Sequence, residues 1–300
     1  MSKSYPKTVQ SPFYVIYNYF ILKRKNPFLA SYKLTYRCNL KCLQCPFYLM
    51  ESKQPTFAEV QSTLEQLHKR GSRLIVFEGG EPMLWKDQDY TIHDAIREAK
   101  KKFFSTGMTT NGILPLDVQT DILWVSIDGL GATHNRLRGA NIFDRIMDNI
   151  RQSEHPKLYI HITINNQNYE EIPELIELLS KETRGMTIQF YYPYNQQEGL
   201  FLPFDKREKL LEQIIWMKKN GYPILNSVAA LHALKRNQWR CLDWLVDNAN
   251  PDNSITHGCY LKGRADQNCP KCGFSPHTEI SLAFQGNWAA IKSGLDIFFR

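Results

Sequence analysis

The seven cysteines of this chain fall into two groups, and their spacing indicates metal chemistry. Cys38, Cys42 and Cys45 follow the pattern C-x3-C-x2-C in the segment CNLKCLQC. The second group consists of Cys241, Cys259, Cys269 and Cys272. An odd number of grouped cysteines argues against a fully paired disulfide framework. Three cysteines are the count for one open cluster site, and four are the count for one closed metal site. Because thiolate-ligated clusters need reducing conditions, the sequence predicts a cytoplasmic environment.

The first group fits an iron–sulfur cluster with one free coordination site. Three thiolates on a tight loop can bind three irons of a 4Fe–4S cube and leave the fourth iron without a protein ligand. That open iron can coordinate a substrate or a cofactor. A three-cysteine zinc loop is the alternative, but zinc sites normally recruit a fourth ligand from a second paired motif close by.

The second group fits a closed four-thiolate site. Cys269 and Cys272 form the metal-type pair C-P-K-C, and Cys241 and Cys259 complete the set. The same four ligands suit a second 4Fe–4S cluster or a structural zinc ion. We expect the second cluster, with zinc as the alternative and unligated buried cysteines as a third interpretation.

Alternating strand-like and helix-like segments must position these cysteines. The predicted strands cover residues 32–36, 73–77, 103–109, 122–127, 158–164 and 187–191. The predicted helices cover residues 57–70, 90–100, 142–152, 169–180 and 205–220. About six β/α units in series predict an α/β fold, a parallel sheet that curls with its helices outside.

The composition divides the chain into three regions. Residues 1–30 form an aromatic and basic N-terminal extension, and residues 31–222 form the predicted barrel. Residues 223–300 become rich in Cys, Asn, Asp and Gly and show little periodicity after about Trp239. We expect this last region to be a small loop-rich domain that binds metal and closes with a helix over 288–299.

Glycine-rich and polar motifs follow the predicted strands in order along the chain. They are Gly79, Gly80, Glu81 and Pro82, then Thr110, Asn111 and Gly112, then Ser126 and Asp128, then Asn165, and last Tyr191 and Tyr192. Active sites of parallel barrels lie at the carboxyl ends of the strands. These motifs are therefore predicted to meet the cysteine loop at one edge of the sheet.

The loop CNLKCLQC and these motifs together resemble the radical S-adenosylmethionine (SAM) superfamily over residues 31–220. The resemblance implies an enzyme built on a partial (β/α)6 TIM-like barrel, with SAM chelating the open iron of the cluster. It implies that an electron enters the cluster and that the sulfonium C–S bond breaks. The resulting 5′-deoxyadenosyl radical then abstracts hydrogen or adds to a double bond, while the protein supplies orientation and shielding.

The resemblance also implies roles for the motifs around the methionine part of SAM. The turn at 79–82 matches the family's GGEP turn, whose glycines let backbone carbonyls approach the amino group of SAM. Glu81 would fix the charge and shape of this turn. Thr110 and Asn111 follow the third strand, as in the family.

The remaining motifs match family positions around the carboxylate and the nucleoside. Ser126 would face the carboxylate or ribose, Asp128 would lie in the same shell, and Asn165 would contact ribose hydroxyls. The tyrosine pair beginning at Tyr191 would flank the adenine. The chain departs from the family at Gln44, because many members carry an aromatic residue just before the third cysteine.

The substrate is the least determined part of the interpretation. The segment Cys269–Pro276 and the apolar helix after it are similar to adenosylhopane synthase-like enzymes, which act on isoprenoid lipids, but lack that group's additional His and Cys residues. We therefore expect an isoprenoid or other lipid substrate. The alternatives are a peptide- or protein-modifying radical enzyme with an auxiliary cluster and a non-catalytic iron–sulfur regulator that binds SAM.

Charge and hydropathy suggest the partners. The formal net charge of +7 favours anionic partners without choosing among them. We expect a small-molecule or lipid substrate and a reductant such as flavodoxin or ferredoxin. We expect no nucleic acid, since the sequence shows no dedicated RNA-binding module and no basic run longer than three residues. The apolar segment 12–22 is too short to span a bilayer. It is predicted either to lie at a membrane surface or to cap the barrel.

Overall fold

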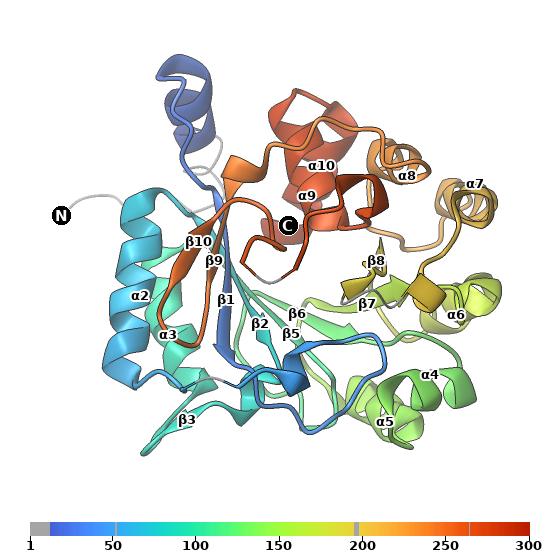
Figure 1. Cartoon of the computed structure of the whole chain (residues 1–300), viewed down its shortest axis with the longest axis horizontal. Coiled ribbons are helices and arrows are strands. Elements are labelled where there is room, and N and C mark those ends of the chain that lie inside the picture. The colour runs from blue at the N-terminus through green and yellow to red at the C-terminus, as the bar shows by residue number, and fades with distance from the viewer. Residues whose placement is uncertain (1–12, 52, 195–197, 264) are drawn as a thin grey trace.

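A curled, mostly parallel sheet forms the centre of the computed structural model, which describes residues 13–51, 53–194, 198–263 and 265–300 (Figure 1). The eight strands are ordered β10-β9-β1-β2-β5-β6-β7-β8. They span Leu29–Thr35 (β1), Leu74–Gly79 (β2), Ser105–Thr110 (β5), Ile122–Ser126 (β6), Leu158–Ile164 (β7), Met186–Phe190 (β8), Val246–Ala249 (β9) and Ile255–His257 (β10). A separate short hairpin pairs Lys86–Asp87 (β3) with Tyr90–Thr91 (β4).

Helices pack against the sheet, and all but the last two described connect its strands. They span Phe57–Arg70 (α2), Ile92–Lys102 (α3), Gly131–Arg138 (α4), Phe143–Gln152 (α5), Ile172–Leu179 (α6), Phe204–Lys219 (α7), Val228–Leu234 (α8), Ser275–Phe284 (α9) and Trp288–Phe298 (α10). The mixed α/β class and the partial barrel predicted from the sequence are confirmed. The sequence did not predict α4, which follows β6.

Local sequence signals explain where α2 and α3 begin and end. Thr56 and Glu59 form a capping box at the start of α2, and Gly71 ends this helix at φ +124°. Thr91 and Asp94 form the equivalent box on α3. Because α3 continues to Lys102, the strand predicted at 103–109 begins two residues late, at Ser105.

The region after residue 223 contributes directly to the sheet. Strand β9 pairs in parallel with β1, and β10 pairs antiparallel with β9. On the opposite edge, the Phe190 N–H donates to the Gly273 carbonyl at 3.0 Å. Helices α9 and α10 lie between the two ends of the curled sheet in Figure 1. The boundary at 222/223 stays a prediction, but the two parts share one sheet.

The amino-terminal end of the barrel interior is filled by aromatic side chains. Trp124 on β6 packs edge to face on Phe298 of α10, with ring centroids 6.1 Å apart, and lies beside Tyr159 of β7. Gly107 on β5 makes room for this tryptophan, because a Cβ there would lie 2.7 Å from its ring. Helix α10 therefore closes one end of the barrel.

The middle of the barrel interior is polar. On β7 and β8 the outward positions are fully buried, whereas His161, Thr163, Thr187 and Gln189 on the inner face are only partly buried. Across the barrel, Lys33 of β1 forms an ion pair with Glu78 of β2 at 2.8 Å. On these two strands only the inner-face side chains are partly accessible. Solvent or a ligand can therefore enter the barrel interior.

The N-terminal segment packs on the outside of the sheet's end. Tyr19, in the π-helical turn Ile16–Ile21 (η1), contacts Phe284 of α9 edge to face at 4.9 Å and lies beside Trp244. Tyr14 donates a hydrogen bond to the Gly71 carbonyl at 3.1 Å. Within the described ranges, no helix combines the length and apolar character needed to cross a membrane.

We expect Trp124→Ala to lower the free energy of unfolding by about 3–5 kcal/mol, because it leaves a cavity between β6 and α10. Urea unfolding of the full chain measures this change. Trp216 on α7 is 60% exposed, so Trp216→Ala serves as the matched control and should change stability by about 0.5 kcal/mol or less. Equal losses in the two variants would show that Trp124 does not close the barrel.

Candidate active site

The cysteine loop lies directly after β1, where it packs against the end of β2. The Gly80 N–H donates to the Thr35 carbonyl at 2.9 Å, and the Glu81 N–H donates to the Arg37 carbonyl at 2.9 Å. A Cβ at Gly80 would lie 2.2 Å from the Arg37 carbonyl oxygen. Only glycine therefore allows the loop to rest on this turn, which gives Gly80 a backbone role in addition to its expected one toward SAM.

The three cysteines of the loop are close enough to influence one another. Burial, with smaller contributions from the neighbouring Cys42 and Cys38, raises the pKa of Cys45 to about 12. Two nitrogen donors lie 3.9 Å from the sulfur atoms, namely Asn111 Nδ2 at Cys38 and an Arg138 guanidinium nitrogen at Cys42. Buried thiols with N–H donors are suited to bind metal as thiolates, so the residues fit a cluster.

Glu81 connects the end of β2 to the end of β5. Its buried carboxylate accepts hydrogen bonds from the Thr110 hydroxyl and the Asn111 N–H, both at 2.8 Å, and from the Met83 N–H at 3.2 Å. Burial raises the pKa of Glu81, and these hydrogen bonds oppose that rise. The turn at 79–82 and the Thr110–Asn111 motif are thus held together by one side chain.

Asp128 is the centre of a second network. One of its carboxylate oxygens lies 2.5 Å from an Arg138 nitrogen and accepts a hydrogen bond from Gln44 Nε2 at 2.6 Å. Its other oxygen accepts the Thr163 N–H at 2.9 Å. Gln44 Oε1 in turn accepts a hydrogen bond from Asn165 Nδ2 at 2.8 Å. The residue that departs from the family pattern therefore links the cysteine loop to the ends of β6 and β7.

The residues expected from the sequence meet at one edge of the sheet. Ser126 ends β6, beside His161 of β7 in the strand register, and Tyr191 follows β8, with its N–H donating to the Ile164 carbonyl at 2.8 Å. Burial raises the pKa of Tyr191 to about 12. Sequence reasoning missed Arg138, because α4 was not predicted and an arginine four residues after His134 carries no distinctive pattern.

The second cysteine group is also brought together by the fold. Burial, with smaller contributions from the neighbouring Cys259 and Cys269, raises the pKa of Cys272 to about 11. Burial, with a smaller contribution from the neighbouring Cys272, raises the pKa of Cys241 to about 12. The aromatic ring of Phe274 packs beside Cys259 and Cys272. Across the described part of the chain, no three His, Cys, Asp or Glu side chains already converge on one ion-sized point.

Comparison with known proteins identifies the domain that carries the loop. Residues 32–179 match the family model described as Radical SAM superfamily. Residues 32–179 of this chain form a radical SAM domain. The family match confirms the resemblance recognised from CNLKCLQC and the strand-end motifs, and it places the chain in a superfamily of enzymes.

The chain aligns with only part of the length of its curated relatives. The chain is 31% identical over 177 residues to Fe-coproporphyrin III synthase of Methanosarcina barkeri, covering 53% of this chain and 42% of the relative. It is 28% identical over 168 residues to pre-heme d1 synthase of Dinoroseobacter shibae, covering 51% of this chain and 41% of that relative. The chain thus spans less than half of the length of these two relatives.

A solved radical SAM structure shares the fold over nearly the whole chain. The structure of Streptococcus suis SuiB bound to S-adenosylmethionine superimposes with a TM-score of 0.66 and 14% identity, covering 97% of this chain and 70% of SuiB. Because the identity is low, this likeness concerns the fold alone. It extends beyond the barrel into the region that holds the second cysteine group.

We expect Gln44→Leu to lower the affinity for SAM about tenfold or more and to leave the iron content unchanged. The change removes hydrogen bonds to Asp128 and Asn165, and one bond to a charged group is worth about 1.5–3 kcal/mol. Anaerobic calorimetric titration of the reconstituted protein measures this affinity. Gln66→Leu, at an exposed position on α2, is the control. Unchanged affinity in the Gln44 variant would show that this network does not shape the SAM site.

Proposed function

We propose that this radical SAM protein binds a 4Fe–4S cluster through Cys38, Cys42 and Cys45 and reductively cleaves SAM. The observation that carries the proposal is the position of the three thiols at the carboxyl edge of the sheet, beside the strand-end motifs. When bound, the cluster and SAM supply an electron and a 5′-deoxyadenosyl radical, and the protein need not provide a general acid or base for that step.

The residues around the loop hold and shield this chemistry. Asn111 and Arg138 direct N–H groups at two of the thiolates, which stabilises their negative charge. The Gly79–Gly80 backbone offers the closest approach for the methionyl group. Asp128 and Asn165 are held in fixed orientations by Gln44, so they are prepared to accept and donate hydrogen bonds to the nucleoside.

We further propose that the second cysteine group binds an auxiliary 4Fe–4S cluster. The four cysteines influence one another's pKa values, which places them near one another. Cys259 and Cys272 lie beside the apolar cluster around Phe274, whereas Cys241 and Cys269 are exposed. Structural zinc remains the alternative, because the same ligands suit both metals. Metal analysis separates the two.

The substrate proposal differs from the one favoured by the sequence. The inner wall of the barrel carries the ion pair Lys33–Glu78 and the polar side chains His161, Thr163 and Gln189. Some of these groups pair with one another or with neighbours on the wall, as His161 does with Thr187 at 3.0 Å. An extended isoprenoid chain would exclude water from the wall, and each donor or acceptor that the wall itself does not pair would then cost about 1–3 kcal/mol. We therefore propose a substrate that presents polar groups to the barrel, such as a peptide or a polar small molecule. The lipid substrate stays a prediction of the sequence.

Two names among the similar proteins are compatible with polar substrates. One solved SuiB structure, which shares the fold at a TM-score of 0.64 and 14% identity, is titled as bound to the precursor peptide SuiA. The curated relative from Methanosarcina barkeri is named for coproporphyrin. These names describe those two proteins only. The reason for proposing a polar substrate for this chain is the polar inner wall of its barrel.

We expect replacement of Cys38, Cys42 and Cys45 by Ala to remove about half of the iron and all formation of 5′-deoxyadenosine. Anaerobic reconstitution should load about eight irons per chain if both groups bind 4Fe–4S clusters. Iron and sulfide analysis together with chromatography of the SAM products measures both effects. A triple variant that still cleaves SAM would contradict the proposed function.

The matched control is replacement of Cys269 and Cys272 by Ser, which should remove the other half of the iron. Stoichiometric zinc with only about four irons in the wild type would assign the second group to structural zinc. Tight SAM binding to a fully loaded wild type without any cleavage would support the non-catalytic regulator instead.

We also propose that η1 contacts a membrane surface. Five large apolar side chains near this turn are more than half exposed: Phe13, Ile16, Tyr17, Phe20 and Ile21. The exposed cations Lys23–Lys25 follow at once. Aromatic faces beside basic residues suit the interface of an anionic bilayer, where each cation is worth about 1 kcal/mol. At the other terminus, Phe298 and Phe299 pack against the protein instead.

We expect the wild type to float with vesicles that contain anionic lipid and to dissociate as the salt concentration rises. Reversing the charges of Lys23, Arg24 and Lys25 to Glu should abolish this binding. Reversing three exposed lysines elsewhere, Lys181, Lys209 and Lys219, is the control and should leave it nearly intact. Absence of binding to any anionic vesicle would overturn the membrane proposal and leave the SAM chemistry untouched.

A further inference from the structure

Arg207 on α7 is a fully buried cation that contacts no carboxylate among the described residues. Its Nε and Nη2 atoms also have no hydrogen-bond partner there. Burial lowers the pKa of Arg207 to about 10, so the guanidinium still carries its charge at neutral pH. A charge in the protein interior is costly unless an opposite charge lies nearby. The surroundings of Arg207 must therefore supply a negative charge.

Three phenylalanine rings surround the guanidinium. Its Cζ atom lies 4.3 Å from the ring centroid of Phe190, 5.0 Å from that of Phe204 and 5.3 Å from that of Phe201. The face of an aromatic ring attracts a cation, but the ring has no net charge and excludes the water that would otherwise solvate the guanidinium. The rings explain how Arg207 is held in place and leave its charge without compensation.

The hydrogen bonds of Arg207 lead to the second cysteine group. Its Nη1 atom donates to the Cys272 carbonyl at 3.3 Å and to Asn237 Oδ1 at 3.1 Å. Asn237 Nδ2 in turn donates to the Pro270 carbonyl at 2.7 Å. The Cys272 thiolate is also the charged group that raises the pKa of Arg207, against the effect of burial. The buried guanidinium thus lies against the loop that carries the pair C-P-K-C.

The packing of this loop fixes its position relative to Arg207. A Cβ at Gly273 would lie 2.5 Å from the Cβ of Phe190, so the backbone after Cys272 rests directly on β8. Phe190 is the residue whose ring lies nearest to the guanidinium. One residue of the sheet therefore supports both the cysteine loop and the arginine.

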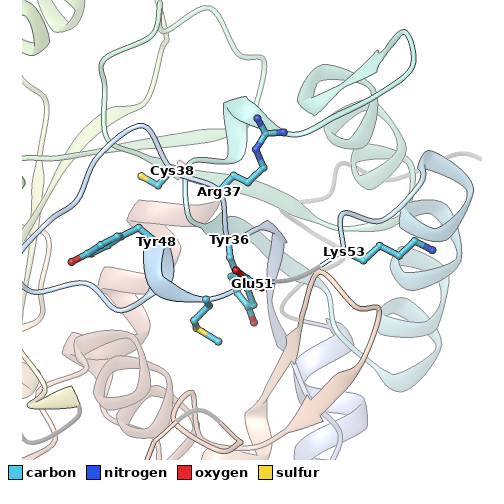
Figure 2. A pocket seen from close by; sticks show the side chains of 7 residues that line it. Tyr36, Arg37, Cys38, Tyr48, Glu51 and Lys53 are labelled. Carbon is cyan, nitrogen blue, oxygen red and sulfur yellow. The ribbon is translucent and has the colours of Figure 1, made fainter.

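The charged residues beside the first cysteine group are in a different environment. Figure 2 shows the hollow that Cys38 lines. The charged residues that line it with Cys38 are Arg37, Glu51 and Lys53, and all three are exposed. Water and salt screen charges at such positions. The buried guanidinium of Arg207 is shielded from water, so its charge acts on a neighbouring group with little screening.

We propose that Arg207 is the buried counter-charge of a metal–thiolate centre formed by the second cysteine group. Four thiolates around Zn²⁺, or around the oxidised core of a 4Fe–4S cluster, carry a net charge of about −2. Four protonated thiols carry none, so only the metal-bound form compensates the guanidinium. The inference rests on the proposed second metal site and holds for either metal. Arg207 does not coordinate the metal; it stabilises the negative charge of the ligands.

The first test measures zinc binding to the full chain in which Cys38, Cys42 and Cys45 are replaced by Ala, so that only the second group competes with a chromophoric chelator. We expect Arg207→Gln, which removes the charge and keeps an N–H donor, to lower the zinc affinity about tenfold or more. Arg207→Lys keeps the charge and should retain most of the affinity. A merely structural role would change the stability of metal-free and metal-bound protein alike and would leave the affinity unchanged.

The second test uses the same chain reconstituted with iron and sulfide. Because a nearby positive charge favours the addition of an electron, Arg207→Gln should lower the midpoint potential of the cluster by about 60 mV or more, the shift that corresponds to a tenfold change in a one-electron equilibrium. A redox titration followed by electron paramagnetic resonance measures this potential.

Lys271→Met is the matched control in both tests. Lys271 lies between Cys269 and Cys272, but it is partly exposed and forms an ion pair with Glu198 at 2.7 Å. Solvent and this partner already weaken the influence of its charge on the cysteines. We therefore expect the control to change the zinc affinity less than about threefold.

An Arg207→Gln variant with wild-type zinc affinity would overturn the inference. Equal losses in the Gln and Lys variants would show that hydrogen bonding to the loop acts instead of charge, and would overturn it as well. Should Arg207→Gln not fold, Arg207→Met fills the same apolar surroundings and carries the same expectation. A wild type that binds neither iron nor zinc at the second group would contradict the proposed metal site itself, so the two failures are distinguishable.

Discussion

The close packing of the cysteine loop on the Gly79–Gly80 turn is the constraint on which the site depends. A Cβ at Gly79 would lie 2.6 Å from the Thr35 carbonyl oxygen, and one at Gly80 would meet the Arg37 carbonyl at 2.2 Å. These distances leave no room for any other residue without moving the backbone. Because the turn is tied to β5 through Glu81, the loop, β2 and β5 form one rigid unit.

A buried ion pair connects this unit to the other half of the barrel. Arg138 reaches from α4 to both Asp128 and Cys42, and Gln44 joins Asp128 to Asn165. Burying these charges is costly unless each is paired and hydrogen-bonded. The network meets that condition for the carboxylate of Asp128, whose two oxygens have three partners. The positions of the thiols and of Asp128 and Asn165 are therefore coupled.

The barrel separates three tasks in space. Its carboxyl edge carries the cysteines, its interior carries the polar groups around Lys33 and His161, and its far end is closed by Trp124 and α10. On the cysteine loop itself, Arg37, Lys41 and Leu43 are exposed to solvent, whereas Cys42 between them is buried.

The sequence by itself determined the family and the order of the elements. The spacing of Cys38, Cys42 and Cys45 and the motifs at successive strand ends were sufficient, because a parallel β/α repeat places those ends at one edge whatever the details of packing. The six predicted strands appear with shifts of a few residues, as at β5, where helix α3 runs on to Lys102. Apolar periodicity and glycine turns are local signals, so they can be read without coordinates.

Only the tertiary structure decided the contacts between distant segments. The partners of Gln44 lie 84 and 121 residues away, and Arg138 lies 96 residues from Cys42. No local pattern encodes such pairs, which depend on how the sheet curls. The addition of β9 and β10 to the sheet could not be predicted for the same reason, since both strands are short and the pairing of β9 with β1 spans more than two hundred residues. The polar lining of the barrel also became visible only when side chains from separate strands faced one another, because composition cannot show which face of a strand is open.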